Sequence, residues 1–224
     1  MMDRKKREAL LVAVLLVLVT AIVGCSGGEV RRLERAKPQA LAGAGERAAM
    51  LAKLNERFEN PDVHFELGQS YRKDGLWRQA KYHYESALRF DPINRAAQAA
   101  LVRILLDRGR QAQAGACAKQ YIEQAEYSWK ETMKLGKAFE QERAGEYAFA
   151  CYQQAVRLSP ESPEGHKAMG CYYLSKNEND MAKECLKQSF RLDPSQAEVA
   201  GELGRLGVIV TLPRSGENGM DRPG

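Results

Sequence analysis

One pattern occurs four times along this sequence, each time 34 residues after the last. The aligned columns are Leu67/Leu101/Leu135/Met169, Gly68/Val102/Gly136/Gly170, Tyr71/Leu105/Phe139/Tyr173, Ala80/Ala114/Ala148/Ala182, Tyr84/Ala118/Tyr152/Leu186 and Pro92/Glu126/Pro160/Pro194. A fixed period of this length indicates stacked copies of one small unit, since such a unit buries its apolar face only against its neighbours. We therefore expect a repeat architecture.

Each unit contains two stretches with helical spacing. In the first unit, Leu67 and Tyr71 lie four residues apart, and Ala80, Tyr84 and Ala87 follow at intervals of four and three, which places each group on one helix face. Turn-forming residues separate the two stretches. An Asp-Pro or Ser-Pro pair closes three of the units, because the residue before proline avoids the helical region. The sequence thus predicts four antiparallel helix pairs, at residues 61–94, 95–128, 129–162 and 163–196.

Small residues indicate how the two helices of a unit meet. Gly68, Gly136 and Gly170 remove a side chain from three of the first helices, and the alanine column keeps every second helix thin. The backbones can then approach closely. The large side chains of the Tyr71 column fill the space beside this contact.

These columns resemble the tetratricopeptide repeat, over residues 61–196. The resemblance implies an all-α, right-handed α-solenoid. The second unit departs from the family pattern at Val102, Ala118, Tyr121 and Glu126, so its geometry is the least determined. We also expect a leading helix at residues 46–60, a capping helix at 197–210 that covers the last apolar face, and a disordered tail at 211–224.

The amino terminus has the features of an export signal. Basic residues precede an apolar run at residues 9–24, which is short for a transmembrane helix. The run ends in Ile22-Val23-Gly24-Cys25, which resembles the lipobox of bacterial lipoproteins. That resemblance implies cleavage after residue 24, lipid attachment to Cys25, and a membrane tether at residues 25–45. An uncleaved inner-membrane anchor is the alternative.

The resemblance also implies a location in the bacterial cell envelope. Ser26, rather than aspartate, follows the cysteine, which in the family suggests the outer membrane, facing the periplasm. The net charge of +5 is mild. Without a concentrated basic stripe and stacking aromatic residues, nucleic acid is a poor candidate partner.

In tetratricopeptide domains the first helices line a concave groove, where we expect a protein or peptide partner to bind. The matching positions are Phe65, Gln69, Arg72, Lys73, Ala99, Arg103, Leu106, Met133, Lys137, Glu140, Lys167 and Leu174. Their mixture of basic and apolar side chains would suit an acidic peptide. A simple solvated surface is the alternative. The carboxylate clamp of the family maps to Phe65, Gln69, Ala100, Lys130 and Lys134, of which only the two lysines fit.

Cysteines recur at Cys117, Cys151 and Cys185, with His83 in the same column of the first unit. Equivalent positions on stacked units lie about 10 Å apart, too far for a disulfide or for shared metal ligation. We therefore predict free thiols, no metal and no cofactor. His64 and His166 share a column in which we expect packing rather than catalysis. Established enzyme motifs are absent from the sequence, and we expect no catalytic residue.

The architecture is similar to that of tetratricopeptide lipoproteins that assist type IV pilus and secretin assembly. The expected function is thus a non-catalytic, membrane-anchored adaptor. Two alternatives stay open. One is an inner-membrane scaffold for peptidoglycan or secretion machinery, and the other is an enzyme that depends on a thiol or a metal.

Overall fold

The computed structural model describes residues 38–211. In that range the chain forms ten α-helices and no strand. α2 (Pro38–Glu56) precedes four helical hairpins, and α11 (Ala197–Arg205) follows them. The hairpins are α3 (Pro61–Lys73) with α4 (Trp77–Phe90), α5 (Arg95–Asp107) with α6 (Gln111–Ala125), α7 (Trp129–Gln141) with α8 (Gly145–Leu158), and α9 (Pro163–Ser175) with α10 (Asn179–Leu192). The predicted all-α solenoid is confirmed.

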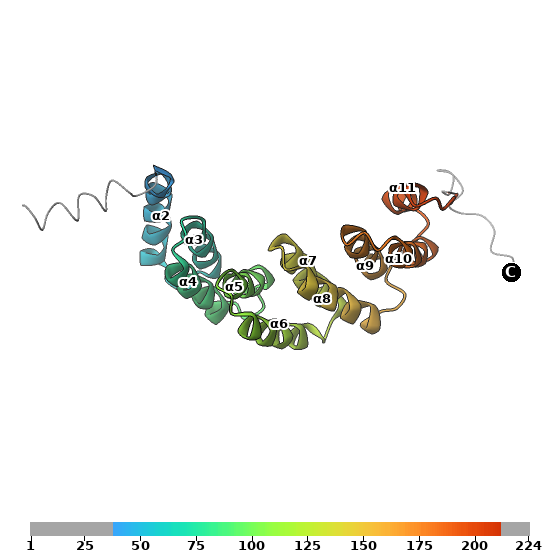
Figure 1. Ribbon diagram of the computed structural model, residues 1–224. Coiled ribbons are helices and arrows are strands. Elements are labelled where there is room, and N and C mark those ends of the chain that lie inside the picture. Colours follow the sequence, from blue (N-terminus) through green and yellow to red (C-terminus); the bar gives the residue numbers. More distant parts are fainter. Residues whose placement is uncertain (1–37, 212–224) are drawn as a thin grey trace, which may run out of the picture.

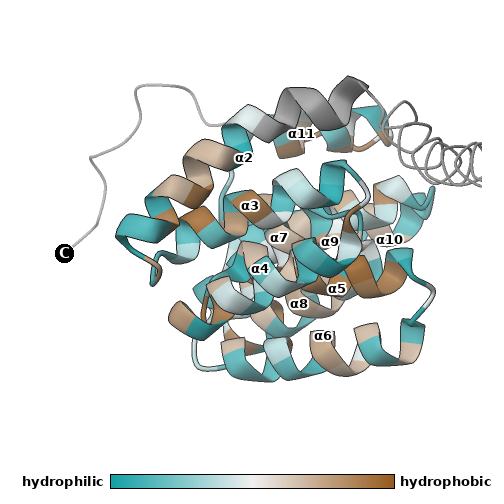
Figure 2. Cartoon of the chain, turned by 90° about the vertical axis from the view of Figure 1, so that its left-hand side faces the viewer, coloured by the Kyte–Doolittle hydropathy of each residue, from teal (hydrophilic) through white to brown (hydrophobic). Residues whose placement is uncertain are grey.

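The hairpins stack into an arch (Figure 1). The first helix of each hairpin lies on the inner side of the arch, and α4, α6, α8 and α10 lie on the outer side. Viewed along the arch, apolar and polar segments alternate on the helices (Figure 2). This pattern is expected when each helix packs on one face and is solvated on another.

The close approach of paired helices depends on glycine. A Cβ atom added to Gly68 would lie 2.5 Å from Cε1 of Tyr84, and one added to Gly136 would lie 2.5 Å from Cε1 of Tyr152. Both tyrosine rings are buried. The ring of the second helix therefore takes the place of the side chain that the first helix lacks.

The second hairpin is built differently. Val102 and Ala118 stand where other hairpins have glycine and a large side chain, and α5 contacts α6 less extensively than the paired helices of the other hairpins contact each other. α5 instead lies between two other repeats. Ala100 belongs to the core of the first hairpin, with Tyr84, whereas Ala99 belongs to the core of the third, with Met133. The position of α5 thus sets how the first and third repeats face each other.

Both terminal helices differ in length from those expected. α2 begins at Pro38, within the range assigned to the tether; the alanine-rich stretch favours a helix, and proline is well suited to a first helical position. α11 ends at Arg205, not 210, because Gly207 adopts a φ of 79° and Val208 N–H donates to Leu203 O, as in a helix-ending motif.

The capping role is nevertheless visible in the packing of α11. Val199 and Leu203 are buried against Leu186 of α10. The predicted leader (1–24), Cys25, most of the tether and almost all of the tail lie outside the described residues. Within residues 38–211, no helix combines the length and apolar character needed to cross a bilayer.

Candidate partner-binding groove

The structure places the twelve predicted groove residues on the four inner helices, but not all of them at the surface. Lys73, Lys137 and Glu140 are exposed, and Phe65, Gln69, Arg72, Arg103, Leu106, Lys167 and Leu174 are half-buried. Ala99 is 0% exposed and Met133 is 5% exposed. These two side chains cannot contact a partner. α5 lies between the first and third repeats, and both side chains are buried where α5 packs against α7.

The inner ends of the first and third repeats meet directly. Nη1 of Arg72, near the end of α3, donates to Oε2 of Glu142, the residue that follows α7. The two residues are 70 positions apart in the chain. Burial alone would lower the pKa of Arg72, but the hydrogen bond to Glu142, together with the electrostatic effects of Tyr84, Glu142 and Asp107, raises the pKa above its ordinary value.

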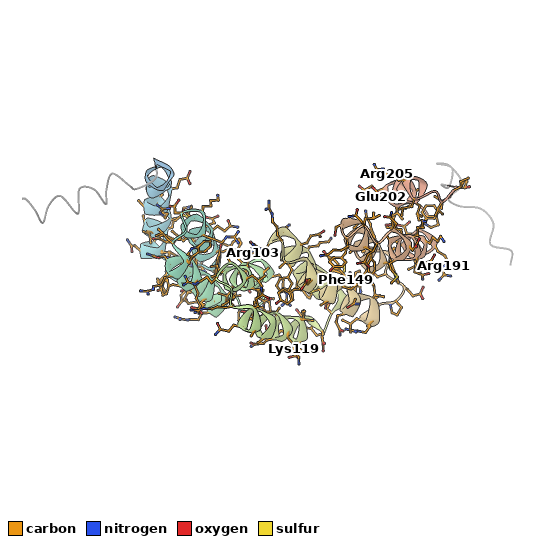
Figure 3. All side chains as sticks on the ribbon, viewed as in Figure 1. Arg103, Lys119, Phe149, Arg191, Glu202 and Arg205 are labelled. Carbon is orange, nitrogen blue, oxygen red and sulfur yellow. The ribbon has the colours of Figure 1, made fainter. Side chains whose placement is uncertain are left out.

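A polar cavity of about 320 Å³ opens beside this ion pair. It is lined by Arg72, Lys73, Trp77, Arg103, Asp107, Gln141, Glu142 and Arg143. Four of these residues are basic and two are acidic. The cavity therefore carries a positive excess and could hold an anionic group. Arg103, which Figure 3 labels on the inner side of the arch, supplies one wall.

Hydrogen bonds hold Arg103 in place within this wall. Its Nη2 lies 2.6 Å from Oδ1 of Asp107, one turn further along α5. Its Nη1 donates to the carbonyl oxygen of Arg143, at 3.3 Å. The second repeat is thereby tied to the turn of the third, and the cavity is formed jointly by three repeats.

Arg143 has an unusual backbone conformation, with a φ of 55°. The equivalent turn positions in the other hairpins are Gly75, Gly109 and Asn177, which also have positive φ and tolerate it better than arginine does. A residue with a Cβ atom in this region costs about 1 kcal/mol. The backbone conformation does not favour arginine here, which suggests that the arginine side chain itself has a role at this position.

A second cavity, of about 290 Å³, adjoins Arg143 between α7, α8 and α9. It is lined by Glu140, Arg143, Gly145, Ala148, Tyr152, Cys171, Tyr172, Ser175 and Lys176. The hydroxyl of Tyr152 donates to Oε2 of Glu140 at 2.8 Å, and Tyr172 stacks on Phe149 at a centroid distance of 4.3 Å. The aromatic and small residues that line this second cavity provide contact area for an apolar side chain.

Sequence reasoning missed Trp77, Glu142 and Arg143 as cavity residues. Trp77 begins a second helix, and the other two lie in a turn, whereas the predicted groove positions all belong to first helices. The one available sign was an arginine in the Gly75, Gly109 and Asn177 column.

The carboxylate-clamp positions do not form an anion site. Ala100 is 0% exposed, and Nζ of Lys134 lies 2.7 Å from Oε1 of Glu131 on the same helix.

The cysteine column does not converge on one point. Within the described residues Cys117, Cys151, Cys171 and Cys185 are unbridged, and no group of three or more metal-ligating side chains gathers in residues 38–211. Burial raises the pKa of the Cys151 thiol to about 12, so this thiol is not a reactive nucleophile. His64 packs against His83 in the core, whereas His166 contacts the carbonyl oxygen of Pro160 at 3.0 Å.

Residues 168–196 match the tetratricopeptide repeat family. Among solved structures, a crystal structure of MamA is 21% identical over 65% of this chain and 80% of its own, with a TM-score of 0.40. YrrB, described as a TPR protein with an unusual peptide-binding site, is 17% identical over 80% and 97%, with a TM-score of 0.41. Pseudomonas aeruginosa pilF is 25% identical over 65% and 67%, with a TM-score of 0.39. A search of curated proteins found no significant match.

Proposed function

We propose that this chain is a non-catalytic adaptor that holds a segment of another protein against the inner face of the arch. The observation that carries the proposal is the cavity beside Arg72, where three repeats bring four basic side chains together. Each repeat supplies a part of the surface, so an extended segment could contact several of them at once.

The chemistry of the inner face favours an acidic segment that also has apolar residues. Positive charge is concentrated in the cavity beside Arg72, and aromatic surface is available in the cavity beside Tyr152. Charge complementarity would orient the partner and accelerate its association, while apolar contacts would slow its release.

A photocrosslinking amino acid placed at different points of the arch tests this proposal in intact cells. Lys73 and Lys137 are exposed on inner helices; Lys119 is exposed on the outer helix α6 and serves as the control (Figure 3). We expect Lys73 and Lys137 variants to yield the same adduct, identified by mass spectrometry, and the Lys119 variant to lack it. The same adduct from Lys119 in equal yield would contradict binding at the inner face.

We further propose that the adaptor is a lipoprotein of the bacterial envelope, attached through Cys25 and facing the periplasm from the outer membrane. The support is the sequence Ile22-Val23-Gly24-Cys25 after an apolar run with a basic start. Work in type IV pilus or secretin assembly is the pathway that this architecture suggests. A scaffold on an uncleaved inner-membrane anchor is the competing proposal.

Metabolic labelling with a radioactive fatty acid separates the two kinds of anchor. The wild-type chain should incorporate label, and Cys25→Ser should lose it and keep its leader. The Cys171→Ser variant, which changes a cysteine within the repeats, is the control and should stay labelled. Equal labelling of the Cys25→Ser and wild-type chains would contradict attachment at Cys25.

A further inference from the structure

The ion pair between Arg72 and Glu142 differs from the other ion pairs between repeats. Arg95 and Glu131 join adjacent repeats, and Lys167 and Glu198 join the last repeat to α11. Arg72 and Glu142 instead join the first repeat to the third, across the inner side of the second. Their side chains are 26% and 13% exposed. The pair therefore lies in the wall of a cavity, where a solvent-borne group can still reach it.

The cavity has more positive charge than its own acidic residues balance. Glu142 forms an ion pair with Arg72, and Asp107 forms an ion pair with Arg103. Neither Lys73 nor Arg143 has an ion-pair partner within the described part of the chain, although both line the same cavity. A further carboxylate entering the cavity would meet two cations that the fold leaves unpaired.

Arg143 links the two cavities because it lines both of them. It places a long cationic side chain at a turn position where the other repeats have glycine or asparagine. A ligand that places an acidic group beside Arg72 would have its next residues near Arg143 and the aromatic cavity around Tyr152 and Tyr172. Contact with such a ligand would account for an arginine at a position that the backbone disfavours.

We infer that Glu142 occupies the place of a ligand carboxylate, and that the arch recognises a peptide with a carboxylate next to an apolar side chain. The carboxylate replaces Glu142 on Arg72, and the apolar side chain enters the cavity beside Tyr152. This inference rests on the proposed binding of a protein segment at the inner face. Glu142 acts as an internal competitor. The apparent affinity for the ligand is the intrinsic affinity multiplied by the fraction of molecules in which Arg72 is released from Glu142.

Three small probes test the inference with the full chain in detergent micelles. Acetyl-Glu-Leu-amide carries a side-chain carboxylate, acetyl-Gln-Leu carries a terminal carboxylate, and acetyl-Gln-Leu-amide carries neither. Ligand-observed NMR titration gives a dissociation constant for each in the millimolar range. We expect at least one carboxylate probe to bind about tenfold more tightly than the neutral one, and the comparison of the two shows which kind of carboxylate is preferred.

Two substitutions in the same ion pair should have opposite effects. Glu142→Gln should tighten binding of the preferred carboxylate probe about fivefold, since release of Arg72 from a partly buried pair corresponds to about 1 kcal/mol. Arg72→Gln should weaken it about tenfold. Both variants should leave the neutral probe unchanged. Glu184→Gln, which removes an ion pair with Lys187 on the outer helix α10, controls for the change in net charge and should have no effect.

A gain in affinity cannot arise from a folding defect, so the Glu142→Gln result stands even if Arg72→Gln destabilises the arch. Unchanged or weaker binding by Glu142→Gln would overturn the competition. Equal binding of all three probes, or no binding of any, would overturn carboxylate recognition. Neither result affects the crosslinking comparison of inner and outer positions, which tests the proposed function by itself.

Discussion

The Nδ1 atoms of His64 and His83 lie 3.0 Å apart in the buried contact between α3 and α4. Nε2 of His64 lies 3.0 Å from the carbonyl oxygen of Phe58, so we assign the His64 proton to Nε2. Its Nδ1 then accepts a hydrogen bond from Nδ1–H of His83. Tyr71 stacks on His83, with an interplanar angle of 10°. A second proton on His64 would set two N–H groups against each other, whereas a second proton on His83, at Nε2, would keep this hydrogen bond but place a charge in the buried contact.

This pair predicts a loss of stability in mild acid. Burial, and then the charge of His64, lower the pKa of His83 to about 4; burial also lowers the pKa of His64, and nearby Arg89 adds to this. An unfolded histidine titrates near 6.5, so the unfolded chain binds protons first as the pH falls. Above about pH 6.5 His83 is neutral in the folded chain and mostly neutral in the unfolded chain, so the free energy of unfolding is not reduced by its titration. This free energy should fall by about 2 kcal/mol between pH 7.5 and pH 5.

Urea unfolding across this pH range measures the effect. His83→Cys introduces the residue that the other three repeats have in this column, and it should flatten the dependence on pH. His166→Gln alters a half-buried histidine whose ring is hydrogen-bonded to the carbonyl oxygen of Pro160, and it should keep the wild-type slope. The same slope in His83→Cys as in the wild type would show that the pair is not responsible.

The glycine contacts predict a graded response to alanine. In Gly136→Ala, the new Cβ would lie 2.5 Å from the Tyr152 ring and 3.0 Å from Cβ of Cys151, so we expect a loss of about 2–3 kcal/mol. In Gly170→Ala it would lie 2.7 Å from both Cγ and Cδ2 of Leu186; a leucine can change rotamer more readily than a buried tyrosine ring can move, and the loss should be about 1 kcal/mol.

Gly201→Ala is the control, because nothing lies within 4 Å of the new methyl group on α11. Helix propensity should make this variant more stable than the wild type, by up to about 1 kcal/mol. Thermal or urea unfolding gives the order of the three variants. A Gly136→Ala protein as stable as Gly201→Ala would contradict the proposed role of the tyrosine ring.

The packing inside each hairpin could be predicted because it depends on contacts that recur at a fixed spacing. Gly68 with Tyr84, and Gly136 with Tyr152, are the same contact in two repeats. The ends of α2 and α11 could not be predicted in the same way. Residues 38–45 have no amphipathic pattern, although their alanine content favours a helix, so the start of α2 was not predicted. At the other end, Gly207 terminates α11 although apolar residues follow it.

The groove could be predicted only in part, because its shape depends on the stacking of one repeat on another. Arg72, Lys73 and Arg103 were identified from their positions in the unit, and they do line a cavity. Ala99 and Met133 occupy equivalent positions, and they would line the groove only if all four inner helices were equally exposed to solvent. The altered second repeat does not meet this condition, because α5 is enclosed by the first and third repeats. The same enclosure brings Glu142 of the third repeat to Arg72 of the first.

The second repeat itself predicts a coupled pair of substitutions. Val102 and Ala118 are both 0% exposed and share one core cluster, in the columns that hold glycine and tyrosine in the first and third repeats. Ala118→Tyr should cost at least about 3 kcal/mol by overpacking, and Val102→Gly should cost about 3 kcal/mol through lost burial and helix propensity.

In the double variant, the glycine leaves room for the tyrosine ring. Its loss of stability should be smaller than the sum of the two single losses by about 2 kcal/mol, measured as a double-mutant cycle by urea unfolding. Additive losses would show that positions 102 and 118 do not form the contact seen in the neighbouring repeats.

The contact between the second and third repeats depends on a buried charge. Arg95 is 7% exposed; its Nε lies 3.4 Å from Oε2 of Glu131, and its Nη1 donates to Oε1 of Gln98 at 3.1 Å. Its Nη2 has no hydrogen-bond partner within the described residues. Glu131→Gln would leave this guanidinium without a countercharge and should cost about 2 kcal/mol. Arg95→Met should cost less, about 1 kcal/mol, since the methionine fills similar volume and Glu131 keeps Lys134 as a partner at 2.7 Å, while buried Oε1 of Gln98 loses its hydrogen bond.

The double variant Arg95→Met, Glu131→Gln should recover about half of the stability lost by Glu131→Gln alone, because no buried charge is then left unpaired and only the exposed Lys134 loses its countercharge. Urea unfolding at pH 7 measures all three variants against the wild type. If Glu131→Gln proved as stable as the wild type, the ion pair would not be what holds α5 against α7, and apolar contacts between Ala99 and Met133 would have to supply that stability. Because α5 fixes how the first and third repeats face each other, a destabilised contact here should also change probe binding at Arg72, although neither residue lines that cavity.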